Sequence, residues 1–527
     1  MSMRNLLWIG RYLTPPVVRI KQGDSEFGLN RSTWLRRGQE RVVKKALYKT
    51  LSEQDVEEII AMQRPDVDDK IVKDDFLRSD VEYHPLNRDY HYRRALRITE
   101  KLFRPSRTLH PIHFSDLRYF PWTLGVSAEF PYTFSKDWKN HIRQKQAEGE
   151  IEDEKMTFHN LYNEIFDLNR KLIHQIKDGE YPFWIDGEPQ PYGFTQVHAR
   201  SHITKPDKPA KLRAVFGVPK LLLMAENMFI WNLQKEYLNE RVKSPMLWGC
   251  ETTKGGAYKV RIRCQGKRHW FYFSSDWSGF DRRALHSIID DIHDMWRRWF
   301  DFSQYEPTNH YPSGRITDEV RIQRLWDWMT NSVKHTPIRT YDGNLYVWQF
   351  AGIMSGYQQT QLLDSFVNMV MTLTVLSELG INLDSEDFTF LVQGDDSLVG
   401  TPEFPLNPEQ WLKDFSKISK RRFNAEMSPE KTTYGSTLDD VEVLHYRNRN
   451  GISYRDDKEL LAHLLYPERP RDFSQLAASA IGIAQASMGT SDAVYRVCQD
   501  VFHFLTTEYG VSPTPPPPEE LFRRGLE

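Results

Sequence analysis

The sequence predicts an α+β fold, because two kinds of apolar pattern alternate along it. Short aromatic-rich runs, each followed directly by acidic residues, are typical of buried strands and end at Asp276 and at the pair Asp395-Asp396. Apolar residues at helical spacing over 285–299 indicate the core-facing side of a helix. A second helical run over 221–231 follows a proline, which fits a helix start. Strands that end in carboxylates, supported by long helices, are therefore expected.

Composition sets wide limits on size and partners. The chain has 527 residues, of which 39% are hydrophobic and 27% charged, enough for a large core or several coupled domains. Aromatic residues make up 13%, which argues against extended disorder. The formal net charge of −2 gives no indication of a polyanionic partner. A nearly neutral chain is nevertheless compatible with an internal basic channel.

Targeting features are absent from the sequence pattern. Cys250, Cys264 and Cys498 are too few and too scattered for a disulfide scaffold or a zinc cluster, and they suit a reducing compartment. The apolar run at the start is too short for a signal peptide. A membrane span needs about 18–20 apolar residues, and no stretch reaches that length. We therefore expect a soluble, cytoplasmic protein without a membrane partner.

The acidic strand ends form the first candidate site. A buried carboxylate is costly unless a cation compensates it, and two such strand ends would hold two divalent metals. Metals of this kind lie about 3.5–4 Å apart and stabilise the attacking and leaving oxygens of phosphoryl transfer. Asp276 would hold metal, whereas Asp281 would accept a hydrogen bond near a sugar; a helix-capping aspartate is the alternative. Asp395-Asp396 lies in a tight turn between two strands, and a ligand-free hairpin turn is the alternative.

A Ser-Gly loop between the acidic sites opens into a helix. Ser355 and Gly356 lie in this loop, where glycine lets the backbone approach a nucleotide closely. Thr360 and Asn368 follow eight residues apart, about 12 Å along the same half of a helix. Small polar groups there would read a ribose hydroxyl, by which a protein distinguishes RNA from DNA. A helix start with buried polar residues is the alternative.

Basic residues precede and follow these sites. Lys205, Lys211 and Arg213 alternate into a strand and would line a path for triphosphates, neutralising the leaving pyrophosphate; a solvated loop is the alternative. Lys431 follows a turn and would protonate the leaving group as a general acid. Segments 441–446 and 452–454 flank the dipeptide Asn-Gly, which predicts a hairpin.

These six features, in this order over 205–454, resemble motifs F, A, B, C, D and E of viral RNA-dependent RNA polymerases. The residues within these motifs are most similar to those of the polymerases of partitiviruses, which are small segmented double-stranded RNA viruses. The matching runs are Lys-Leu-Arg-Ala-Val-Phe-Gly-Val-Pro, Ser-Gly-x3-Thr-Gln-Leu-x-Asp-Ser-x2-Asn and Gln-Gly-Asp-Asp-Ser. The Gln before Gly-Asp-Asp departs from the Tyr or Leu often found there, but the partitivirus group tolerates it.

The resemblance implies a right-hand polymerase with palm, fingers and thumb, closed by fingertip loops. It divides the chain into an N-terminal extension bridging fingers and thumb (1–70), fingers with the basic segment (71–268), palm with a fingers insertion near 301–350 (269–445), and thumb with a proline-rich tail (446–527). It also implies two Mg²⁺ ions per site, with Mn²⁺ as an alternative.

The resemblance further assigns a role to each site residue. Asp276 and Asp395 would be the main metal ligands with Asp396 assisting, Asp281 and Asn368 would recognise the ribose, Ser355 and Thr360 would position template and nucleotide, Arg213 would clamp the triphosphate, and Lys431 would be the acid. The implied function is template-directed RNA synthesis that replicates and transcribes a double-stranded RNA genome. Its partners would be RNA template and product, nucleoside triphosphates and the viral capsid protein, in the virion interior and the host cytoplasm.

Two other functions compete with this hypothesis. A reverse transcriptase shares the acidic strand ends, but it would carry a bulky residue that blocks the 2′-hydroxyl rather than the pair Asp281 and Asn368. A structural RNA-binding protein inside a capsid would need none of the acidic residues or Lys431. The sequence contains no G-x4-G-K-[ST] run, so we expect no helicase domain.

Overall fold

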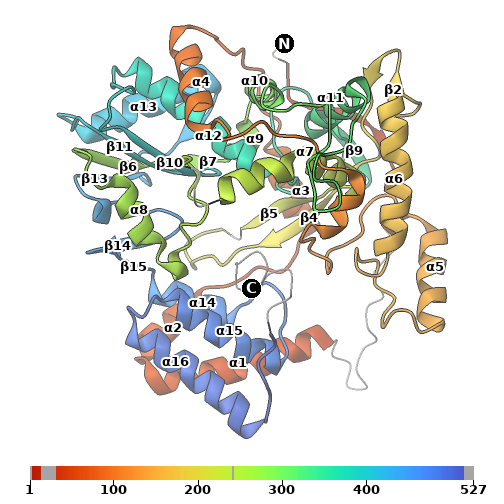
Figure 1. The fold of residues 1–527 in the computed structure, drawn as a ribbon. Helices are drawn as coiled ribbons and strands as arrows, with labels where there is room; N and C mark the ends of the chain where they lie inside the picture. The colour runs from red at the N-terminus through yellow and green to blue at the C-terminus, as the bar shows by residue number, and fades with distance from the viewer. Residues whose placement is uncertain (1–2, 14–30, 210, 240–242, 516–527) are drawn as a thin grey trace.

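The computed structural model describes residues 3–13, 31–209, 211–239 and 243–515. Two sheets and their covering helices form the upper part of the molecule in Figure 1, and a helical bundle lies below them. Two of the long predicted helices are confirmed as α7 (Lys220–Leu238) and α10 (His286–Arg297). Of the helices in the described part of the chain, none is long and apolar enough to cross a membrane.

A four-stranded antiparallel sheet carries the acidic strand ends. Its order is β10 (Thr389–Gln393), β11 (Asp396–Thr401), β6 (Phe271–Ser274) and β13 (Thr433–Gly435). Phe271 and Phe273 of β6 are fully buried, and their rings contact Trp411 of α13 (Pro408–Phe423). Helix α12 (Thr360–Glu378) packs against β10. This packing fixes the strands whose ends bear the carboxylates.

A five-stranded sheet carries the basic segment. Its order is β1 (Leu6–Arg11), β9 (Asn344–Trp348), β8 (Ile338–Arg339), β4 (Thr195–Ser201) and β5 (Leu212–Gly217). Strands β4 and β8 run parallel and the other pairs run antiparallel. The strand nearest the N-terminus therefore pairs with a strand from the predicted insertion near 301–350.

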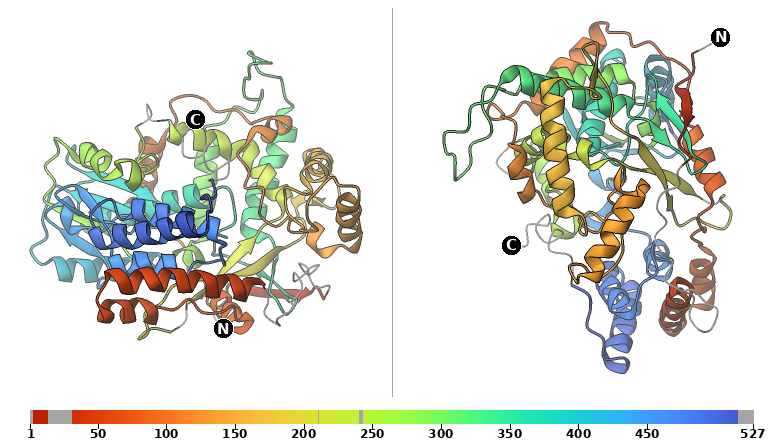
Figure 2. Two further views of the ribbon diagram at one scale, coloured as in Figure 1. Left: turned by 90° about the horizontal axis from the view of Figure 1, so that it is seen from below. Right: turned by 90° about the vertical axis from the view of Figure 1, so that its right-hand side faces the viewer.

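Both ends of the chain build the lower helical bundle. One apolar cluster joins Val43, Leu47 and Val56 from the N-terminal side with Leu464 and Val497 from the C-terminal side. Figure 2 shows the first two helices lying beside the last ones. The members are α1 (Arg31–Thr50), α2 (Glu53–Ala61), α14 (Asp457–Leu465), α15 (Phe473–Ala486) and α16 (Asp492–His503).

The other helices surround the two sheets. They are α3 (Asp69–Leu77), α4 (Tyr90–Phe103), α5 (Lys136–Ala147), α6 (Tyr162–Asp178), α8 (Gly256–Cys264), α9 (Phe280–Arg283) and α11 (Glu319–His335). Short helical turns occur at η1 (Phe114–Tyr119), η2 (Tyr132–Phe134), η3 (Thr252–Lys254), η4 (Leu438–Asp440) and η5 (Phe504–Glu508). Two-residue or three-residue strands form the pairs β2 (Trp184–Ile185) with β3 (Glu188–Pro189), β7 (Trp277–Ser278) with β12 (Glu426–Met427), and β14 (Arg447–Arg449) with β15 (Ile452–Tyr454).

The predicted hairpin turn and its second strand are confirmed, but the first strand lies at Arg447–Arg449 and not at the predicted 441–446. Asn450 and Gly451 have φ of 52° and 80°, the left-handed conformation that a tight hairpin turn requires. Segment 441–446 forms no strand because Leu444 and His445 have φ of 52° and 63°, which folds it into a separate turn. The pairing therefore starts only at β14.

The predicted division into fingers, palm and thumb stays a prediction. The N-terminal extension contributes β1 to the five-stranded sheet and α1 and α2 to the helical bundle. Its residues 14–30 lie outside the described part of the chain, as does the proline-rich tail beyond Pro515. The backbone amide of Thr514 donates to the carbonyl of Ser474, so the described part of the tail lies at the start of α15.

Candidate active site

The acidic residues lie at the ends of two paired strands. Gly394 has a φ of 65° and makes the tight turn between β10 and β11 that contains Asp395, as predicted. Strands β11 and β6 pair antiparallel with Val399 opposite Phe273. Strand β6 ends at Ser274, two residues before Asp276, and β11 begins at Asp396, whose carboxyl group is affected by the charges of Asp395 and Asp276. Adjacent strands thus bring the three predicted carboxylates to one edge of the sheet.

Burial, together with charge repulsion, raises the pKa values of Asp395 and Asp396. Burial, the charge of Asp395 and more weakly that of Asp276 raise the pKa of Asp396 to about 6. Burial also raises the pKa of Asp395, and the Asp276 charge adds to the effect. The Nζ of Lys431 lies 4.0 Å from Oδ2 of Asp276, so one basic side chain already faces this group. A divalent cation would relieve the remaining repulsion.

The acidic group fits hard divalent cations by its chemistry. Carboxylate oxygens are the ligands that Mg²⁺ and Mn²⁺ prefer. Within the described residues, no three acidic, histidine or cysteine side chains form a ready-made ligand sphere. The fit therefore rests on oxygen donors and on uncompensated negative charge, and a metal would draw these side chains together.

Asn368 supports the acidic turn from behind. Its side chain is fully buried on α12, and its Nδ2 donates to the carbonyls of Gly394 at 3.1 Å and Asp395 at 2.8 Å. Its Oδ1 accepts from the indole of Trp277 at 3.2 Å and from the hydroxyl of Thr372 at 3.1 Å. Both ends of the amide are thus engaged within the protein. Ribose recognition by Asn368 stays a prediction that would need these bonds to be exchanged.

The Ser-Gly loop closes against the end of the basic strand. A Cβ on Gly356 would lie 2.2 Å from the backbone carbonyl of Phe216, so only glycine fits there. The hydroxyl of Thr360 donates to the carbonyls of Met354 at 2.6 Å and Tyr357 at 3.2 Å. Thr360 therefore closes the loop at the start of α12.

Glu226 of α7 anchors the same loop, and sequence reasoning missed it. Its carboxylate accepts the backbone amides of Gln358 at 3.2 Å and Gln359 at 3.3 Å, and the side-chain amide of Gln359 at 2.9 Å. Glu226 is fully buried, and burial raises its pKa to about 8 despite these bonds. The only sign in the sequence is one acidic residue inside the otherwise apolar run over 221–231.

The buried carboxyl group of Asp364 and the partly exposed one of Asp281 lie beside the acidic turn. Burial and the charge of Asp395 raise the pKa of Asp281 to about 6. Burial, the charges of Asp281 and Asp395, and a side-chain hydrogen bond to Asp281 raise the pKa of Asp364 of α12 well above its usual range. Two carboxyl groups that share a hydrogen bond hold a proton between them. Asp364 lies within the matched run of α12, but sequence reasoning assigned it no role.

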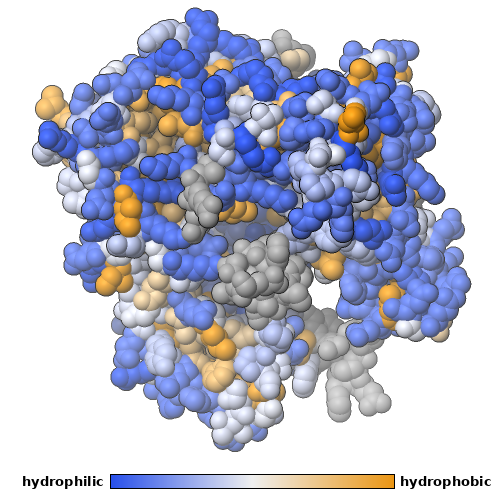
Figure 3. All heavy atoms as spheres, viewed as in Figure 1, coloured by the Kyte–Doolittle hydropathy of each residue, from blue (hydrophilic) through white to orange (hydrophobic). Residues whose placement is uncertain are grey.

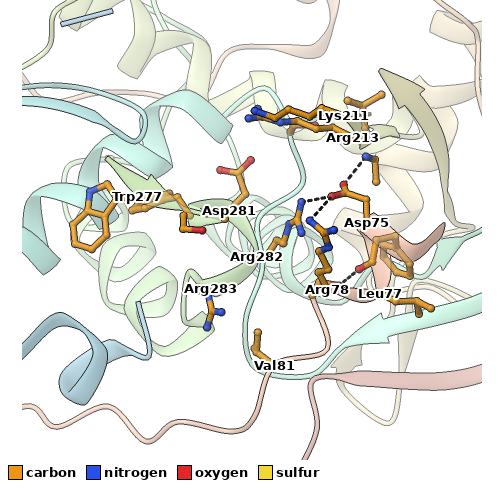
Figure 4. Close-up of a pocket in the computed structure, with 18 of the residues that line it drawn as sticks. Asp75, Leu77, Arg78, Val81, Lys211, Arg213, Trp277, Asp281, Arg282 and Arg283 are labelled. Atoms are coloured by element: carbon orange, nitrogen blue, oxygen red, sulfur yellow. Dashed lines mark hydrogen bonds and ion pairs between the residues drawn. The ribbon is translucent and has the colours of Figure 1, made fainter. Parts of the chain in front are cut away.

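One large cavity collects most of the predicted site residues. Its volume is about 1720 Å³. Figure 3 shows a mainly hydrophilic face that is hollowed near its centre, and Figure 4 shows Lys211 and Arg213 lying across from Asp281. The predicted residues in its wall are Asp276, Asp281, Asp395, Ser355, Gly356, Lys211, Arg213 and Lys431. Four predicted residues do not belong to the described lining of this cavity. Thr360 and Asn368 support the loop and the turn from behind. Asp396 lies at the start of β11, and Lys205 precedes β5.

The chain belongs to a known protein family. The family model described as viral RNA-dependent RNA polymerase matches residues 168–499, a span that contains all twelve predicted site residues. Fold and site thus define a nucleotidyltransferase, and the chain is an RNA-directed RNA polymerase that uses divalent metal ions, an RNA template and nucleotides.

Individual viral polymerases are also similar to this chain, in agreement with the family model. The chain is 29% identical to the RNA-directed RNA polymerase of White clover cryptic virus 1, over 98% of this chain and 90% of that protein. It is 26% identical to the RNA-directed RNA polymerase of Atkinsonella hypoxylon virus, over 76% of this chain and 65% of that protein. The Sicinivirus 3Dpol RNA-dependent RNA polymerase matches in structure with a TM-score of 0.58 and 14% identity, over 86% of this chain and 88% of that one. This structural likeness confirms the right-hand polymerase fold.

Proposed function

We propose that this polymerase replicates and transcribes the genome of a double-stranded RNA virus. This proposal is supported by the residues of its motifs, which resemble those of partitivirus polymerases. Its similarity to the White clover cryptic virus 1 polymerase extends over 98% of the chain, well beyond the motif region. The partitivirus resemblance implies a virus whose other segment encodes the capsid protein. We therefore propose the capsid protein as its partner, with the virion interior and the host cytoplasm as its locations.

The proposed cofactor is a pair of Mg²⁺ ions, with Mn²⁺ as an alternative. Asp276 and Asp395 would bind both ions and Asp396 would assist, which is supported by their place at two paired strand ends. When bound, two such ions stabilise the attacking and leaving oxygens of an in-line displacement. Replacement of Mg²⁺ by Ca²⁺, which prefers more ligands at longer distances, should abolish synthesis while it preserves folding.

The remaining proposed roles belong to side chains in and behind the cavity wall. Lys211 and Arg213 neutralise the triphosphate, with Lys205 at the outer end of the same segment, and Lys431 donates a proton to the leaving pyrophosphate. Asp281 accepts a hydrogen bond from the ribose with Asn368 behind it, while Ser355 and Gly356 approach the template and Thr360 holds their loop. Template sequence is read by base pairing, so the protein supplies shape and backbone contacts.

Nucleotide choice separates this proposal from its rival. We expect ribonucleotides to be incorporated on a single-stranded RNA template and deoxyribonucleotides to be rejected by about 100-fold or more, because a site built to hydrogen-bond a hydroxyl discriminates strongly against its absence. Equal use of both sugars would favour a reverse transcriptase. RNA binding without any incorporation would favour the structural RNA-binding protein.

A further inference from the structure

Asp75 joins two parts of the cavity wall that lie far apart in the sequence. It sits on α3, outside the six motif segments, and is 8% exposed. Its Oδ1 accepts from Nη2 of Arg282 at 2.7 Å, and its Oδ2 accepts from the backbone amide of Ala214 at 2.9 Å. Figure 4 shows both bonds, with Arg78 as a further basic neighbour at 4.0 Å. One buried carboxylate thus holds two separate segments.

The two residues held by Asp75 are sequence neighbours of nucleotide-site residues. Ala214 directly follows Arg213 on β5, and Arg282 directly follows Asp281 on α9. Strand β5 is the edge of its sheet, and within the described residues no strand pairing connects it to the segment that contains α9. The carboxylate of Asp75 is therefore a direct bridge between them.

The bridge fixes the distance between a cation and an acid that face the same cavity. Figure 4 shows the side chain of Arg213 extending towards the carboxylate of Asp281, and both residues line the cavity. A nucleotide that contacts both needs them at a fixed separation before it binds, since each adjustment on binding costs affinity. Helix α3 packs along β5, so it supplies a rigid support for this carboxylate.

The geometry points to Asp75 as a positioning residue that holds Arg213 and Asp281 at the separation that the incoming nucleoside triphosphate requires. This inference rests on the proposed roles of Arg213 and Asp281. Asp75 itself touches neither base nor metal ligand, so its loss should weaken nucleotide binding equally for all four bases. A residue that merely anchored α3 would change stability without changing the KM for nucleotides.

The test is steady-state RNA synthesis by the full chain with Asp75→Asn. We expect the KM for each of the four nucleotides to rise about tenfold while kcat stays within about twofold, the pattern of lost binding rather than lost chemistry. The matched control is Asp69→Asn, because Asp69 is an exposed acidic residue at the start of the same helix and does not belong to the described lining of the cavity. Arg213→Ala is measured in parallel and should raise the KM as well.

Each outcome has a distinct meaning. If Asp75→Asn leaves the KM unchanged while Arg213→Ala raises it, the role of Arg213 stands and the Asp75 inference is overturned. If neither variant changes the KM, both the proposed role of Arg213 in nucleotide binding and the Asp75 inference are overturned. If Asp75→Asn does not fold, Arg282→Gln removes the same ion pair from its other side and is judged by the same criterion.

Discussion

The side-chain amide of Asn368 donates a hydrogen bond of 2.8 Å to the backbone carbonyl of Asp395. The helix that follows the Ser-Gly loop thereby holds the turn that carries the proposed metal ligands. The same amide accepts from Trp277, which directly follows Asp276. One buried side chain thus connects both acidic strand ends, and its contacts are to the backbone, an indole and the hydroxyl of Thr372 rather than to the carboxylates.

Replacement of Asn368 by Ala should therefore impair both stability and synthesis. It leaves the carbonyls of Gly394 and Asp395 and the indole of Trp277 buried without a partner, at a cost of about 1–3 kcal/mol for each group that stays unsatisfied. We expect a lower free energy of unfolding and a rate of incorporation reduced by about 100-fold, since small misplacement of reacting groups costs that much. Thr372→Val, which removes a bond to the same amide but leaves the turn supported, is the control for denaturant unfolding and activity. Full activity of Asn368→Ala would contradict this support.

Gly356→Ala should block the closure of the Ser-Gly loop. The new Cβ would meet the carbonyl of Phe216 at 2.2 Å, and this backbone atom cannot move aside alone. Because a displacement of about 1 Å can reduce a rate by about 100-fold, we expect a loss of that order in primer extension. Gly125→Ala serves as the control, since a Cβ there meets nothing within 4 Å. Equal activity of the two variants would show that the close approach is unimportant.

Lys431→Met should lower the rate of the chemical step. If Lys431 donates the proton to pyrophosphate, its loss should reduce kcat by about 100-fold and leave RNA affinity unchanged, as expected for general acid catalysis. Lys417 is a matched control because both lysine side chains are 74% exposed and each faces one aspartate, at 3.4 Å for Lys417 and 4.0 Å for Lys431. Pre-steady-state nucleotide incorporation distinguishes the two. An equal effect of both substitutions would show that Lys431 acts only as a surface charge.

Glu226 should make stability depend on pH. Burial raises its pKa from the ordinary 4.5 to about 8, so the folded chain retains a proton that the unfolded chain loses. Its contribution to the free energy of unfolding is fully present below about pH 4.5 and is lost as the pH rises through about 8. The stability of the wild type relative to Glu226→Gln should therefore fall across this window in denaturant titrations. A flat or rising difference for Glu226→Gln would contradict the prediction.

Much of the active site could be predicted because its residues carry local signals. Asp276 and Asp395 follow apolar strands directly, Gly356 lies where the backbone of another segment leaves no room for a side chain, and Asn450 marks a backbone conformation that few residues adopt. Such features depend on neighbours in the sequence, so a single chain reveals them. The predicted strand over 441–446 was wrong because left-handed residues at 444 and 445 override its apolar composition.

The supporting residues could not be predicted in the same way. Asp75 and Glu226 act on loops and strands more than a hundred positions away, and their own neighbours in the sequence give no hint of those partners. The pairing of β1 with β9 joins residues that lie still further apart in the sequence. Asn368 was found, yet its contacts show support for the acidic turn, which no spacing rule indicates. Long-range contacts of this kind follow from tertiary packing alone.

The most direct test of the central claim is incorporation of labelled ribonucleotides by the purified chain on single-stranded RNA with Mg²⁺, beside Asp395→Ala. The account predicts template-length product from the wild type, and loss of product both in Asp395→Ala and on removal of the metal by a chelator. RNA binding should persist in all three samples, which separates catalysis from folding. Template-length product from Asp395→Ala, or none from a folded wild type that binds RNA, would contradict the assignment of the acidic strand ends as the catalytic centre.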